Sequence, residues 1–125
     1  TYLNNSALAE AAGEKFGVKV SFFWEPIPHY NGSEKHLPMY KYLPERHLYS
    51  EFGYNLFQKK IDSGKVKLPN QFGWLADTQK DVDGFLYVDF MHYSAVYSQA
   101  IALHIYNDLV RWKVLPESPV NAMPY

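Results

Sequence analysis

Asp89 and His92, three residues apart, are the pair whose types and spacing best fit catalytic chemistry in this sequence. They follow the apolar run 85–88 and precede Ser94, a good N-cap for the amphipathic segment 95–112. In a turn between a strand and a helix, this spacing brings a carboxylate within hydrogen-bonding reach of an imidazole. The carboxylate would fix the imidazole tautomer and leave the other ring nitrogen free to take a proton from a nucleophile. A surface pair that merely caps a helix would show the same short pattern.

The residues on both sides of the four-residue motif Asp-x-x-His also follow a recognisable pattern. Residues 86–95 read Leu-Tyr-Val-Asp-Phe-Met-His-Tyr-Ser-Ala. This block resembles the C-terminal Asp-x-x-His motif of the SGNH (GDSL-type) hydrolases, which are serine esterases and acyl hydrolases on a flavodoxin-like three-layer α/β/α fold. Weaker likenesses to the same family lie upstream at 72–79 and 22–26. The resemblance implies that Asp89 orients His92, and that His92 is the base of a Ser-His-Asp triad.

The resemblance does not extend to the serine, glycine and asparagine blocks that give this family its nucleophile and oxyanion hole. Ser94 and Ser98 do not lie in a G-x-S-x-G or Gly-Asp-Ser context. The resemblance therefore implies that residues 1–125 are a single partial domain, the C-terminal half of an SGNH-hydrolase domain. The expected partners of this chain are the N-terminal segment of the same protein and a small ester substrate, such as an O-acyl carbohydrate. No cofactor is expected, and this chain alone should be inactive.

Composition narrows the remaining classes of function. The chain has 125 residues, 47% hydrophobic and 20% charged, as expected of one globular domain. A net charge of −1 without a basic stripe argues against nucleic acid and anionic membranes as partners. The absence of cysteine excludes disulfides and thiolate catalysis, and the four histidines other than His92 are not spaced as metal ligands. No run predicts a transmembrane helix, so we expect a soluble protein, with secretion and the periplasm both left open as its location.

The order of helical and extended patterns predicts an α/β chain with parallel strands. Helices are expected at 3–17, 47–61 and 95–112, and strands at 18–24 and 85–88, with a third short strand at 74–76 left open. Gly17 offers the left-handed residue that ends a helix. Residues 113–125 should form a surface tail. One contiguous core is expected to hold Val20, Phe22, Trp24, Val88, Ile101 and Ile105.

The long connection 25–46 leaves the end of a predicted strand, where open α/β sheets bind their ligands. Its length without clear periodicity is typical of a functional loop. We therefore expect this loop to line the substrate cleft with His29, Tyr30 and Tyr40. A plain surface loop with half-buried tyrosines fits the same pattern. The non-catalytic alternative for the whole chain is a carbohydrate-binding or interaction module that uses these tyrosines as a stacking surface.

Overall fold

The computed structural model of the chain describes residues 2–39, 41, 48–80 and 82–116. Helices and short strands alternate along this part of the chain. Their order is α1 (Tyr2–Phe16), β1 (Phe22–Trp24), α2 (Leu48–Asp62), β2 (Phe72–Trp74) and α3 (Ala95–Arg111). The two strands pair in parallel, with Phe23 opposite Gly73. The predicted α/β class is therefore confirmed at this level.

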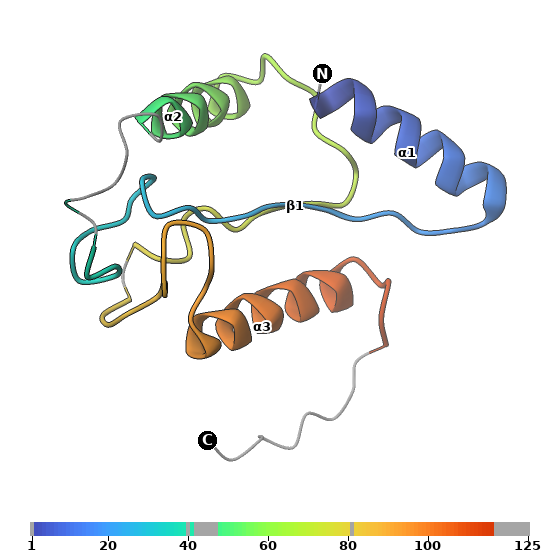
Figure 1. Cartoon of the computed structure of the whole chain (residues 1–125). Helices are drawn as coiled ribbons and strands as arrows, with labels where there is room; N and C mark the ends of the chain where they lie inside the picture. Colours follow the sequence, from blue (N-terminus) through green and yellow to red (C-terminus); the bar gives the residue numbers. More distant parts are fainter. Residues whose placement is uncertain (1, 40, 42–47, 81, 117–125) are drawn as a thin grey trace.

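Helices cover both faces of the strand pair. Figure 1 shows α1 and α2 on one side of the strands and α3 on the other. Because the strands are parallel, their carboxyl ends lie at the same edge, and the chain leaves both strands there. This edge is where the segments after β1 and β2 meet the loop that precedes α3.

The strand predicted at 85–88 is wrong. Within that segment, Tyr87 forms an isolated antiparallel bridge with Tyr93, and the chain folds back on itself there. The second strand of the sheet is β2. The third strand suggested at 74–76 overlaps β2 only at Trp74. The strand predicted at 18–24 is confirmed only at its carboxyl end, where β1 lies.

Gly73 explains why β2 forms where the apolar pattern is weak. A Cβ atom at this position would lie 2.6 Å from the ring of Phe23 and 2.7 Å from the carboxylate of Asp108. Because glycine has no Cβ, β1 and α3 can approach β2 closely. Gly73 thus permits the close packing of β2 against Phe23 and Asp108.

The main apolar core lies between the strands and α3. Its buried members are Leu37, Leu75, Leu86, Tyr87, Tyr97 and Ile101, with Phe23, Phe90, Tyr93 and Ile105 packed against them. The prediction of one core that also holds Val20, Phe22, Trp24 and Val88 is wrong. Side chains alternate along a strand, so Phe23 faces α3 while its neighbours Phe22 and Trp24 face the opposite side. Val88 is exposed.

An aromatic cluster fills the opposite face of the strands. The Trp24 ring lies 4.9 Å from Tyr2 of α1 and 4.4 Å from Phe57 of α2, measured between ring centroids. Trp24 also stacks on Trp74 of β2 at 5.9 Å. Trp24 thus joins both helices to the sheet, and this cluster is separate from the α3 core.

The apolar stripes of α1 and α2 are turned to solvent. In α1, Leu8 and Phe16 are exposed, Phe16 to 75%. In α2, Phe52 and Leu56 are exposed, Phe52 to 68%. Within each helix the two residues are separated by a multiple of four positions, so they lie close to one face. Within residues 2–39, 41, 48–80 and 82–116, nothing buries these stripes.

The helix boundaries follow the local signals in the sequence. Gly17, with a φ of +67°, follows the last residue of α1, as predicted. Ser94 is the N-cap of α3, and its hydroxyl accepts a hydrogen bond from the Tyr97 amide at 3.2 Å. Where the structure describes the chain, no helix has the length and apolar character needed to cross a membrane.

Candidate active site

Asp89 and His92 form the hydrogen-bonded pair that their spacing predicts. Nδ1 of His92 lies 2.8 Å from Oδ2 and 2.9 Å from Oδ1 of Asp89. A carboxylate can only accept, so Nδ1 carries a proton, and in the neutral ring Nε2 is the unprotonated nitrogen. The His92 side chain is 74% exposed, and none of the residues described bonds to its Nε2. The pair therefore offers a preset proton acceptor to solvent or to a partner group.

The Asp89 carboxylate also organises the backbone of its own loop. Its Oδ1 accepts the amide N–H groups of Met91 and His92, both at 2.8 Å. The bond from the Met91 amide is the first cause that lowers the pKa of Asp89 to about 2, followed by the bonds from the His92 ring and amide. The carboxylate stays ionised near neutral pH, so it can stabilise a protonated imidazole.

A short backbone ladder closes the loop that carries the pair. The amide of Val88 donates to the carbonyl of His92 at 3.0 Å, and the amide of Ser94 donates to the carbonyl of Leu86 at 2.8 Å. These bonds flank the bridge between Tyr87 and Tyr93. The closed loop is a more rigid support for the imidazole than an open turn would be.

Tyr93 fastens this loop to the carboxyl end of β1. Its hydroxyl lies 2.9 Å from the carbonyl of Pro26 and 3.1 Å from Oε2 of Glu25. Burial, and then the negative charge of Glu25, raise the pKa of Tyr93. The pair thus stands at the sheet edge where parallel α/β proteins bind ligands.

The predicted substrate residues are placed differently. His29 and Tyr30 are buried, and the Tyr30 backbone carbonyl accepts a hydrogen bond from Gln79. Their side chains support the loop after β1 and do not line an open cleft in this structure. Tyr40, the third predicted contact, lies outside the described residues. Contact of these residues with a substrate stays a prediction.

The tyrosines that the structure describes mostly point inward. Tyr87 and Tyr97 are almost fully buried, and their rings pack with the centroids 5.6 Å apart. The Tyr97 hydroxyl lies 2.8 Å from the Thr78 hydroxyl, and Tyr93 packs against both rings. The abundance of tyrosine therefore builds the core beneath the Asp89 loop, and these three rings offer no stacking surface for a sugar.

Gln79 is a supporting residue that the sequence did not single out. Its side chain is fully buried, and its amide nitrogen donates to the carbonyls of Ile27, at 2.8 Å, and Tyr30. Its Oε1 accepts the hydroxyl proton of Tyr87 at 2.6 Å. Gln79 thus joins the loop after β1 to the segment that leads into Asp89. No local pattern signals such a residue, because its partners lie 8 to 52 residues away along the chain.

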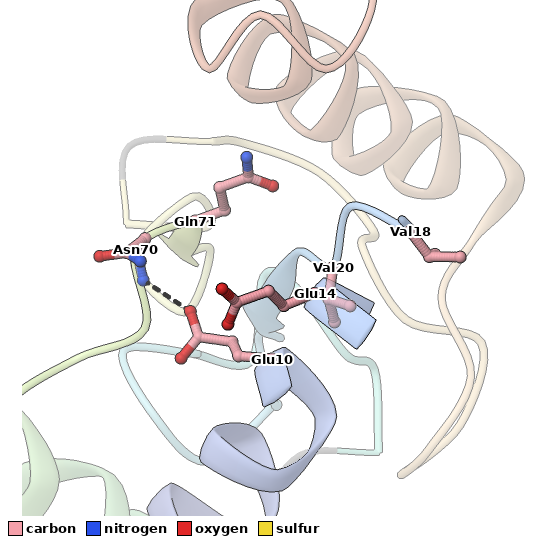
Figure 2. Close-up of a pocket in the computed structure, with 6 residues that line it drawn as sticks. All are labelled: Glu10, Glu14, Val18, Val20, Asn70 and Gln71. Atoms are coloured by element: carbon pink, nitrogen blue, oxygen red, sulfur yellow. Dashed lines mark hydrogen bonds between the residues drawn. The ribbon is translucent and has the colours of Figure 1, made fainter. Parts of the chain in front are cut away.

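A cavity in the described part of the chain does not include this pair among its lining residues. It has a volume of about 370 Å³ and lies beside α1, at the amino ends of the strands. Figure 2 shows the residues that line it: Glu10, Glu14, Val18, Val20, Asn70 and Gln71. The backbone amide of Asn70 donates a hydrogen bond to the Glu10 carboxylate. Asp89 and His92 are attached to the opposite, carboxyl ends. The described chain has no group of three or more side chains arranged to hold a metal ion.

Comparison of the chain with protein-family models, with curated proteins and with solved structures found no match.

Proposed function

We propose that this chain supplies the general base and its orienting carboxylate to a serine ester hydrolase of the SGNH type. The observation that carries the proposal is the contact of Nδ1 of His92 with both oxygens of Asp89, at 2.8 and 2.9 Å. This contact sets the tautomer in which Nε2 is unprotonated and faces outward. The same arrangement of carboxylate and imidazole activates a hydroxyl nucleophile in acyl transfer.

In the proposed reaction, Nε2 of His92 takes the proton of a serine hydroxyl as the oxygen attacks the ester carbonyl. The imidazolium that forms is stabilised by the Asp89 carboxylate, whose pKa of about 2 keeps it ionised. His92 then gives the proton to the leaving alkoxide, and a water molecule repeats the cycle on the acyl-enzyme. Every step that falls to this chain is a proton transfer at Nε2.

The serine and the donors of the oxyanion hole are proposed to come from another polypeptide segment, the N-terminal part of the same protein. The exposed apolar stripes of α1 and α2 support this, since they fit a surface that more polypeptide covers. The strand pair gives further support. The Phe23 amide and carbonyl point to the edge of β1 that β2 does not occupy, where an added strand could pair. We propose that such strands complete a flavodoxin-like sheet.

We propose an ester on a polar acceptor, such as an O-acyl carbohydrate, as the substrate. The support is the position of the pair at the carboxyl edge of the strands, beside the Glu25 carboxylate that could accept hydroxyl protons. The test is to screen the intact protein on acetylated sugars, lipid esters and p-nitrophenyl esters. Hydrolysis of acetylated sugars above the others is expected, and activity only on phosphodiesters or peptides would contradict the substrate class.

A second experiment tests the division of labour between the two segments. Residues 1–125 are assayed with p-nitrophenyl acetate alone and after addition of the N-terminal segment. We expect turnover only in the mixture, because loss of oxyanion donors alone costs about a hundredfold to a thousandfold in rate. Turnover by residues 1–125 alone that depends on His92 would show that the nucleophile lies in this chain.

A further inference from the structure

His36 is a buried residue beneath the candidate site that holds its neighbours through both its side chain and its backbone. Its side chain is 1% exposed, and its Nε2 lies 2.7 Å from the carbonyl oxygen of Val82. Its own carbonyl accepts the amide protons of Leu86, at 2.9 Å, and Tyr87, at 3.1 Å. One residue of the loop after β1 thus holds the segment that leads into Asp89 at three points.

We infer that His36 is a positioning residue for Asp89 and His92. Few contacts separate His36 from the pair, because Leu86 and Tyr87, which bond to His36, also pair with Ser94 and Tyr93 across the closed loop. Holding one side of this ladder fixes the register of the other side, where His92 lies. The catalytic meaning of this role rests on the proposed function, whereas the structural role is a property of the chain itself.

The chemistry of His36 predicts a tautomer opposite to that of His92. The Val82 carbonyl can only accept, so Nε2 of His36 must carry the proton. Nδ1 of His36 is buried and has no hydrogen-bond partner among the residues that the structure describes. A neutral ring with an unprotonated Nδ1 fits this environment, whereas a second proton on Nδ1 would have no acceptor.

The neighbouring ion pair cannot replace this anchor. Lys35 and Asp83 meet at 2.7 Å beside the contact between His36 and Val82, but their side chains are 47% and 90% exposed. Exposed pairs contribute little and are weakened by salt. Of these two neighbouring contacts, the buried bond between His36 and Val82 is therefore the stronger attachment of this segment to the loop after β1.

The first test compares His36→Gln with His36→Asn in the histidine-labelled protein by NMR. The glutamine amide can reach the Val82 carbonyl, whereas the asparagine side chain is one methylene too short. In His36→Asn we expect amide exchange at Met91 and His92 to rise at least about fivefold, the factor for one net hydrogen bond, and the Nδ1–H tautomer of His92 to be partly lost. His36→Gln should restore both, and His104→Asn, on the exposed part of α3, should change neither. Unchanged exchange and tautomer in a folded His36→Asn variant would overturn the inference.

The second test needs no variant and holds even if His36→Asn fails to fold. Nitrogen chemical shifts of the unaltered protein should show Nε2–H at His36 and Nδ1–H at His92. A proton on Nδ1 of His36 would overturn the inference. Neither test measures turnover, so a protein without esterase activity would contradict the proposed function and leave the result on His36 standing.

Discussion

The two faces of the strand pair differ in how completely they are covered. On the α3 side, the stripe of the helix meets a closed core, in which the Thr78 hydroxyl is paired with the Tyr97 hydroxyl and the Gln79 side chain with Tyr87. On the other side, α1 and α2 contact Trp24 through a few aromatic rings while Phe16 and Phe52 stay exposed. The same periodic signal in the sequence thus leads to burial in one helix and to exposure in two.

The difference separates the part of the fold that this chain completes from the part that it leaves open. The candidate site stands on the closed side, where Gln79 and Tyr87 support the Asp89 loop. A preorganised pair requires such support, because a small misplacement of a catalytic group is costly. The open side is where we propose that another segment packs.

The largest effect should follow from emptying the closed core. Tyr97→Ala removes a ring that is 1% exposed, and we expect the free energy of unfolding to fall by about 3–5 kcal/mol. The matched change on the open side, Tyr49→Ala on α2, should cost under about 0.5 kcal/mol, because Tyr49 is 80% exposed. Both are measured by denaturant unfolding. Equal losses at the two sites would break the comparison.

A smaller effect is expected from Gln79→Leu. The change leaves the carbonyls of Ile27 and Tyr30 and the hydroxyl of Tyr87 without their shared partner, at a cost of about 2–3 kcal/mol. The control is Gln99→Leu on the exposed part of α3, which should be close to neutral. A neutral result at Gln79, measured by the same unfolding experiment, would show that the network beneath the site contributes no net stability.

Alkaline pH should act on tyrosines of both faces: Tyr87 and Tyr93 beside the candidate site, and Tyr54 of α2, whose ring packs on Trp24. Burial raises the pKa of Tyr54, Tyr87 and Tyr93 above the ordinary value near 10. Their contribution to stability is therefore complete below about pH 10 and is lost as the pH rises further, because the unfolded chain releases these protons more readily. Tyrosinate absorbance should rise together with unfolding. Titration of all three in the folded state near pH 10 would contradict their burial.

Acid should produce the smallest effect. The pKa of Asp89 is about 2 in the folded state and about 3.9 in an unfolded chain. The stability that it contributes is present above about pH 4 and is lost as the pH falls towards 2. Asp89→Asn should flatten the decline of stability in this window. A residual slope should remain from Asp83, whose pKa is lowered by the hydrogen bond from Lys35. A slope that is unchanged in Asp89→Asn would show that the carboxylate is not held as described.

Local signals predicted what depends on neighbours in the chain. Ser94, Gly17 and the apolar spacing gave the three helices to within a few residues, and the spacing of Asp89 and His92 gave their contact. Side chains three or four residues apart meet on a helix or in a turn whatever the rest of the fold does.

Features that depend on distant partners were missed or misplaced. The apolar run at 85–88 predicts a strand, but Leu86 and Tyr87 bond to the carbonyl of His36, about 50 residues upstream, and not to a sheet. Likewise, Gly73 lies against Phe23 and Asp108, which are 50 and 35 residues away along the chain. No short window contains these partners, so neither the course of the sheet nor the support beneath the site could be predicted from periodicity.

We propose His92 as the base of an ester hydrolase, and kcat/KM of the intact protein on p-nitrophenyl acetate measures this role most directly. His92→Ala is expected to lower kcat/KM at least about a thousandfold, mainly through kcat, because triad members act at the transition state. His104→Ala, a change of the same kind on the exposed part of α3, should leave kcat/KM unchanged. Turnover that survives His92→Ala undiminished would contradict the account.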